Sequence, residues 1–293
     1  MLGVCADGGG MRRLANAATL CVAVGLLGLA GCQDTPSVTL DPLTTSGRTG
    51  NAPQLGYDAV MHIADASRAG GDFGNAVNLY RHAATLEPHK VEPLDALGGT
   101  LLDMGNVDEA IVNFNAALKL SSRDGIALRG LARAYLKTGR PDLAGNPLAM
   151  AFQDTPDDPK LMLLIGVADD FIGQHTAAQV RYRHGLQIAP ADRSLAINLA
   201  LSLALSEKFD EAIAVLRPVA MAPGATAQER QTLALIYGIK GDQKMAREVA
   251  RIDLDPASVD HNVAFYESLR RLPPEARSKA ILSASTGSRA PQS

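Results

Sequence analysis

The sequence predicts an all-α fold, a right-handed α-α superhelical solenoid of about six repeats closed by a C-terminal capping helix. Three observations predict it. Apolar residues recur at helical intervals, a tight-turn residue interrupts them at a set place, and the whole pattern returns every 34 residues over residues 57–260. Each unit is therefore a helix, a turn and a second helix, and neighbouring units stack to bury their apolar faces.

Three positions in each unit show the register. A small residue on the first helix recurs as Ala64, Gly98, Ala132, Gly166, Ala200 and Ala234. A small residue on the second helix recurs as Ala76, Ala110, Ala144, Ala178, Ala212 and Ala246. Between them the turn residue is Gly71, Gly105, Gly139, Gly173, Glu207 and Gly241. Larger side chains would hold the two helices apart, and glycine supplies the unhindered backbone of the turn.

A helix-turn-helix unit with this period and these small positions resembles the tetratricopeptide repeat family over residues 57–260. The repeats start at Tyr57, Val91, Gly125, Pro159, Arg193 and Ala227. The main departure from the family pattern is the aromatic site near the start of each first helix, filled here by Val60, Leu94, Leu128, Met162, Ala196 and Arg230. The resemblance implies a curved stack whose first helices line a concave surface.

Residues 1–31 have the features of a secretory leader. Arg12 and Arg13 form its basic region, residues 14–29 its apolar region, and the sequence ends with Leu29-Ala30-Gly31-Cys32. Those four residues resemble a bacterial lipobox, in which the cysteine becomes the first residue of the mature protein and carries acyl chains. Met11 is the start that we expect. The alternative is an ordinary cleaved signal peptide with an incidental cysteine.

Residues 32–56 then comprise the lipidated Cys32 and a flexible tether rich in Thr, Pro, Gly and Ser. Gln33 follows the cysteine, and by analogy with lipoprotein sorting this favours the periplasmic face of the outer membrane. The other two cysteines, Cys5 and Cys21, lie in the leader. The folded part therefore has no thiol for a disulfide, a metal site or a nucleophile.

A closing helix follows the repeats within residues 258–272, and we set the capping domain at residues 261–272. Val263, Tyr266 and Leu269 share one side of it. A solenoid needs such an end unit to cover its last apolar face. Pro273 and Pro274 then stop the helix, and we expect residues 273–293 to be a disordered tail.

The first half of the predicted concave lining is charged. Arg129, Arg133 and Lys137 are spaced four apart and stand on one helix face, where like charges repel. Two interpretations remain open. Either Asp95 and Asp103 of the preceding repeat pair with the cations, or the stripe captures an acidic segment of a partner protein.

The second half of the lining is apolar. Its predicted groove residues are Leu163, Val167, Phe171, Ile197, Leu201, Leu205, Leu235 and Ile239. A groove of this kind would bind a helix or an extended peptide of a partner. Two alternatives remain open: the assignment is off by a turn, or the closing helix folds back over the groove and buries it.

No arrangement of residues predicts catalysis, a metal site or a cofactor. The six histidines are scattered and none has metal-ligand spacing with another histidine or a carboxylate motif. The formal net charge is −3, so nucleic acid is not an expected partner. We expect a non-enzymatic protein whose partners are proteins and, through Cys32, a membrane.

The last repeat and closing helix carry a narrower resemblance. Residues 230–270, with Asn262 and Tyr266 after the turn at residues 253–256, are similar to the end of TadD-type lipoproteins of the Flp, or tight-adherence, pilus system. The resemblance implies an outer-membrane scaffold that helps the pilus secretin assemble or localise. The alternative is a lipoprotein regulator or adaptor of peptidoglycan synthases or hydrolases.

Overall fold

A computed structural model describes residues 55–285, and that part of the chain is entirely helical and irregular structure without a strand. The helices are α1 (Tyr57–Ala69), α2 (Phe73–Leu86), α3 (Glu92–Asp103), α4 (Val107–Leu120), α5 (Gly125–Lys137), α6 (Pro141–Asp154), α7 (Pro159–Phe171), α8 (His175–Ile188), α9 (Arg193–Leu205), α10 (Phe209–Ala220), α11 (Ala227–Lys240), α12 (Gln243–Ala250), α13 (Pro256–Arg270) and α14 (Pro274–Ser285). The predicted leader, Cys32 and nearly all of the tether lie outside the described residues.

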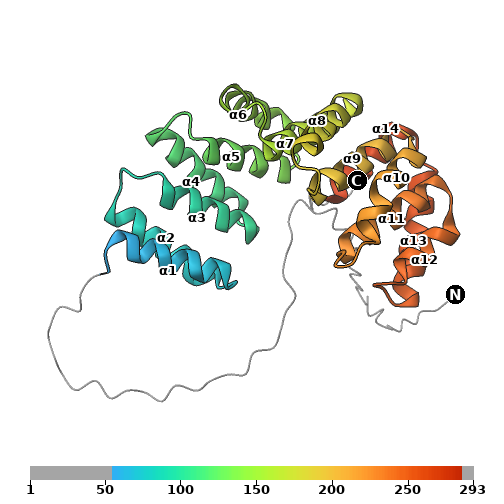
Figure 1. Ribbon diagram of the computed structural model, residues 1–293, viewed down its shortest axis with the longest axis horizontal. Helices are drawn as coiled ribbons and strands as arrows, with labels where there is room; N and C mark the ends of the chain where they lie inside the picture. Colours follow the sequence, from blue (N-terminus) through green and yellow to red (C-terminus); the bar gives the residue numbers. More distant parts are fainter. Residues whose placement is uncertain (1–54, 286–293) are drawn as a thin grey trace, which may run out of the picture.

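The first twelve helices form six antiparallel pairs that follow one another along an arch (Figure 1). The first helix of each pair begins at the predicted repeat start or one residue after it. First helices of successive repeats contact one another, α3 with α5, α5 with α7, α7 with α9 and α9 with α11. They therefore line the inner side of the curve, and the predicted all-α solenoid is confirmed.

Side-chain caps fix where the first helices begin, and they recur with the repeat. The carboxylates of Asp124, Asp158 and Asp192 accept hydrogen bonds from the first backbone N–H groups of α5, α7 and α9. Thr226, at the same position of the next repeat, forms a capping box with Glu229. These groups satisfy backbone donors that the helix itself leaves unpaired.

The turn between paired helices requires a left-handed residue in every repeat. Five repeats have glycine there, with φ between 68° and 101°. The fifth repeat has Glu207 there with φ 62°, the one positive φ among the non-glycine residues of the described chain. A side chain in this conformation costs about 1–2 kcal/mol relative to the right-handed region. The contact of Glu207 with α14, described below, accounts for this exception.

The small positions on the first helices are occupied by aromatic rings from the second helices. A Cβ atom added at Gly166 would lie 2.4 Å from Cε1 of Tyr182. At Gly98 the added atom would lie 2.8 Å from Cε1 of Phe114, and at Gly130, which is outside the small-residue series, it would lie 2.3 Å from the same ring. Alanine or glycine at these sites therefore lets an aromatic ring fill the space between helices.

The C-terminal end differs from the sequence prediction. The closing helix α13 begins at Pro256, five residues before the expected boundary at residue 261. The disordered tail expected from residue 273 is wrong for residues 274–285, which form α14. Pro273 and Pro274 end one helix as expected, but a proline is also well suited to the first turn of the next, where its missing N–H has no helical partner.

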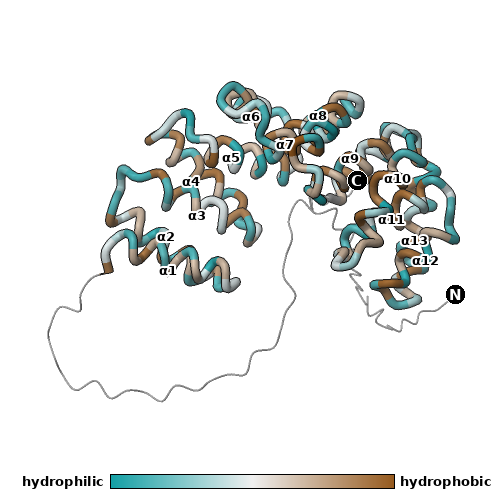
Figure 2. Tube along the Cα trace, in the orientation of Figure 1, coloured by the Kyte–Doolittle hydropathy of each residue, from teal (hydrophilic) through white to brown (hydrophobic). Residues whose placement is uncertain are grey.

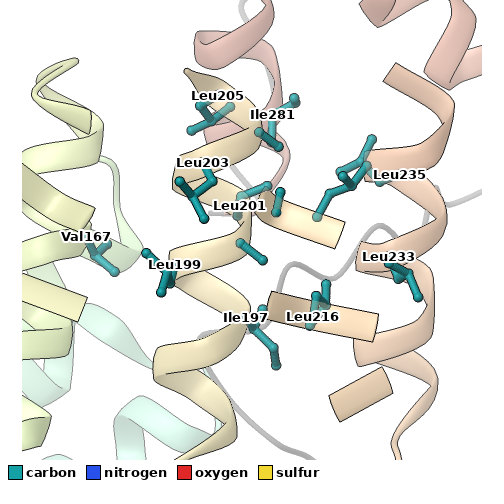
Figure 3. Close-up of a cluster of buried hydrophobic side chains, with 14 of the residues drawn as sticks. Val167, Ile197, Leu199, Leu201, Leu203, Leu205, Leu216, Leu233, Leu235 and Ile281 are labelled. Atoms are coloured by element: carbon teal, nitrogen blue, oxygen red, sulfur yellow. The ribbon is translucent and has the colours of Figure 1, made fainter. Parts of the chain in front are cut away.

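Helix α14 folds back onto the array and contacts α9 (Figure 1). Ile281 of α14 is 2% exposed and belongs to one hydrophobic cluster with Leu201, Leu205 and Leu235 (Figure 3). Along α9 every residue from Leu195 to Leu205 is buried, and all but Asn198 and Ser202 are hydrophobic (Figure 2). In the second half of the arch the inward-facing residues of α9 therefore belong to the hydrophobic core.

Most residues of the predicted apolar groove are buried in this structure. The buried members are Val167, Ile197, Leu201, Leu205, Leu235 and Ile239. Leu163 and Phe171 are only partly buried. The physical reason is the one that the sequence left open: a helix from the C-terminus covers part of this face, although the helix is α14 and not α13.

Candidate functional site

The first half of the inner face is open and holds a cavity of about 540 Å³ between α3, α5 and α7. The residues around it come from four repeats and mix cations, carboxylates and apolar groups. They are Arg68, Glu92, Asp95, Ala96, Gly99, Phe114, Ile126, Arg129, Gly130, Arg133, Lys160, Leu163 and Leu164. A concave site with an apolar floor and a few convergent polar groups is the usual form of a binding pocket.

The apolar floor depends on glycine. Phe114 of α4 is buried to 1% exposure and reaches the cavity between α3 and α5 because Gly98 and Gly130 leave room for its ring. Gly99 lies one residue further along α3 and faces the cavity. A Cβ there would meet only the guanidinium of Arg68, at 3.6 Å. The absence of a side chain at Gly99 therefore keeps the cavity open without being required by packing.

The three cations predicted on α5 are brought together, and each has a partner within the chain. Nη2 of Arg133 donates to Asp103 at 2.9 Å, and Arg68 donates to the same carboxylate at 2.8 Å. Arg129 pairs with Asp158 of the following repeat at 3.2 Å. Lys137 donates to the backbone carbonyl of Leu102 at 3.2 Å.

Pairing with Asp103 was expected, whereas pairing with Asp95 is not found. Burial lowers the pKa of Arg133 and of Lys137, and the charge of Arg133 adds to the effect on Lys137. Groups within the chain therefore pair with all three cations of α5, and the same helix borders the cavity. Arg129 and Arg133 line the cavity, and Lys137 does not.

Asp95 lies in the wall of the cavity with an unsatisfied atom. Its side chain belongs to a residue only 5% exposed, and Oδ1 has no hydrogen-bond partner. Burial raises the pKa of Asp95 to about 7. The charge of Asp124, a side-chain hydrogen bond with Asp124 and the charge of Glu92 act in the same direction, and the charge of Arg129 opposes them. Nε of Arg133, another lining residue, is also buried and unpartnered. A buried acceptor and a buried donor are thus available to a ligand at one cavity.

A second cavity, of about 730 Å³, lies between α14 and the turns that end α5 and α7. Phe171 and Leu205 line it together with Ser278 and Lys279 of α14. At its base the buried Asp170 accepts hydrogen bonds from the hydroxyls of Tyr182 at 2.9 Å and Ser202 at 2.7 Å, and Nδ1 of His175 lies 2.7 Å away. Asp170 is satisfied and joins the fourth and fifth repeats.

The sequence placed cations on the inner face correctly but missed the cavity beside them. Among the predicted site residues Arg129, Arg133 and Leu163 line it. Gly99, Gly130, Phe114 and Lys160 were not predicted as site residues. The signal that could have found them is the pair of glycines on the inner faces of α3 and α5, outside the positions that the repeat requires to be small.

Two further findings concern the described residues only. Within residues 55–285 no group of three or more His, Cys, Asp or Glu side chains is placed to hold a metal ion. In the same range no helix combines the length and the apolar character needed to cross a membrane.

Comparison with known proteins finds a repeat family over part of the array. Residues 101–164, from α3 of the second repeat to α7 of the fourth, match the family described as Tetratricopeptide repeat. The chain is thus an all-helical scaffold of stacked repeats, the class whose curved inner surface binds proteins. The family match covers residues 101–164, and the helix pairs on either side of them repeat the same geometry.

Several solved structures have a similar fold. A tetratricopeptide repeat protein from Parabacteroides merdae has a TM-score of 0.61 at 14% identity, covering 74% of this chain and 86% of that one. PilF of Pseudomonas aeruginosa has a TM-score of 0.58 at 18% identity, with 71% and 97% covered. A chain of the Cut9–Hcn1 hetero-tetramer has 0.62 at 15%, with 78% and 43% covered. At these identities the likeness concerns the fold.

Proposed function

We propose that this protein is a non-enzymatic outer-membrane lipoprotein that holds partner proteins in the open half of its concave face. The observation that carries the proposal is the cavity in which Oδ1 of Asp95 and Nε of Arg133 are buried without partners beside an apolar floor. A partner segment with an apolar side chain for the floor and an N–H group for Asp95 would satisfy both parts of the site.

The anchor and the partner extend this proposal. The resemblance of residues 29–32 to a lipobox supports acylation of Cys32 and attachment to the periplasmic face of the outer membrane. The resemblance of residues 230–270 to TadD-type lipoproteins supports a role in assembling or localising the secretin of a Flp pilus. The fold shared with PilF is compatible with this role and does not by itself favour it.

The test fills the cavity without disturbing the fold. Gly99→Leu places a side chain in the cavity, and the exposed Gly145→Leu on α6, where an added Cβ meets nothing, is the matched control. Both changes favour helix by about 1 kcal/mol, so neither should unfold the protein. In cells crosslinked before the outer membrane is solubilised, we expect Gly99→Leu to reduce secretin recovery at least tenfold and Gly145→Leu to leave it unchanged.

The partner that is recovered decides between functions. A secretin with pilus components supports the proposal, whereas a peptidoglycan synthase or hydrolase would replace it with the alternative. Equal recovery by the two variants would remove the cavity from the binding site. A Cys32→Ser protein that still fractionates with the outer membrane would contradict the anchor.

A further inference from the structure

Helix α14 of the chain itself packs on the inner face of the second half of the arch. Only three residues of α14 with described side chains are buried: Arg277, Ser278 and Ile281. Arg277 and Ile281 are four residues apart and so lie on one face of the helix. Ile281 belongs to the same hydrophobic cluster as Leu201, Leu205 and Leu235, and α14 contacts α9 (Figure 3). This is how an amphipathic helix lies in a groove.

The polar anchor of α14 is specific to this face. Nη2 of Arg277 donates to Glu207 at 2.5 Å, and Glu207 is the residue that replaces glycine in the turn after α9. The ion pair with Arg277 accounts for Glu207, the one residue of the described chain other than glycine with a positive φ. The turn carries a carboxylate where a guanidinium from the inner face can reach it.

Helix α14 nevertheless fits this face incompletely. Nε of Arg277 is buried without a hydrogen-bond partner, although the residue is only 4% exposed. The cavity of about 730 Å³ runs along the same helix and is lined by Ser278, Lys279 and Leu282. A buried N–H group without an acceptor lowers stability, and the open cavity leaves this side of α14 without packing contacts. Isolated helices of twelve residues are marginal in water, so α14 gains little by itself.

We propose that the inner face of the fourth to sixth repeats is a second docking surface, for an amphipathic helix of a partner protein with an arginine four residues before an aliphatic side chain. Helix α14 is its occupant in cis, and a partner helix with a larger apolar side chain at the place of Ser278 displaces it by filling the cavity. This surface is distinct from the open cavity lined by Asp95 and does not depend on the partner bound there.

The experiment uses the full chain and a labelled peptide of residues 273–285 that carries Ser278→Leu. In the anchor variant, Arg277→Ala with Ile281→Ala, α14 no longer competes at the high local concentration of a tethered segment. By fluorescence anisotropy we expect the peptide to bind the anchor variant at least tenfold more tightly than the wild-type chain. A chain with the exposed Ala276→Ser should behave as wild type. A peptide that also lacks its arginine should bind severalfold more weakly.

Equal affinity for the anchor variant and the wild type would overturn the proposal, and so would failure of the peptide to bind an anchor variant that keeps its helical circular dichroism. If that variant does not fold, amide hydrogen exchange of the wild-type chain decides. Amides of α14 that exchange at least a hundredfold faster than those of α11 support a displaceable helix. Equal protection of the two helices would make α14 an ordinary part of the core.

Discussion

The two halves of the arch have the same repeat and opposite inner faces. Three positions of the first helix, spaced four apart, face inward in every unit. In the second and third repeats they carry Asp95, Gly99, Asp103, Arg129, Arg133 and Lys137. In the fifth repeat they carry Ile197, Leu201 and Leu205, all buried, and α14 packs beside them. The 34-residue repeat therefore does not decide whether an inward-facing side chain is exposed to solvent or buried in the core.

What decides is whether another segment covers the position. Charged side chains keep the first half open, since their ion pairs, such as those of Asp103 with Arg68 and Arg133, stay at the edge of water. Apolar side chains in the second half would be a liability if left exposed. The same array thus offers one surface that is ready for a ligand and one that is already occupied.

The sharpest test of this contrast uses one position in two repeats. Ile197 and Leu163 are 34 residues apart and occupy the same place on α9 and α7, but Ile197 is 6% exposed whereas Leu163 is only partly buried beside the open cavity. Ile197→Asp should cost about 3–5 kcal/mol because it buries an unpaired carboxylate in the core. Leu163→Asp should cost about 1 kcal/mol. Urea denaturation of both variants measures the difference, and equal costs would erase the distinction between the two faces.

The open half also contains a group that its surroundings disfavour. Because the pKa of Asp95 is raised from 3.8 to about 7, the native state keeps a proton that the unfolded state has released between those pH values. Stability therefore falls as pH rises through this window. Asp95→Asn removes the titration, so its stabilising effect should be about 2 kcal/mol larger at pH 8 than at pH 5.

Denaturation midpoints at the two pH values test this prediction. The exposed Glu248→Gln on α12 is the control and should shift the midpoint equally at both. A variant Asp95→Asn whose effect is independent of pH would mean that the carboxylate is already ionised and paired in the native state. In that case Oδ1 of Asp95 would not be available to a ligand.

Sequence periodicity was sufficient for most of the fold, because each repeat signals its own helices locally. The starts of the six first helices follow from residues within one unit, and the buried alanine series from Ala76 to Ala246 follows from the same register. Helix α14 could not be found in this way. It lies outside the 34-residue pattern, and only Arg277 and Ile281 anchor it. The partner of Arg277, Glu207, is 70 residues away in the sequence.

The site was predictable only in part for a related reason. Charges on the inner face of α5 are visible as a spacing, but the cavity beside them arises from residues that are missing side chains, Gly99 and Gly130. Whether Asp95 pairs with Arg129 or stays unpartnered depends on Asp158 of the following repeat, which takes the arginine at 3.2 Å. Such competition between repeats is a property of packing and cannot be derived from one helix.

The smallest expected effect concerns the contact that joins α14 to the turn. In a double-mutant cycle of Glu207→Gln and Arg277→Gln, the coupling should be about 0.5–1 kcal/mol, because Arg277 is buried but the side chain of Glu207 is 54% exposed and screened by water. The control cycle is the exposed pair Lys240 and Asp210, 2.5 Å apart, which should couple more weakly. Similar coupling in the two pairs would mean that Glu207 does not hold α14. The replacement of glycine in that turn would then have no explanation in the packing of the second half.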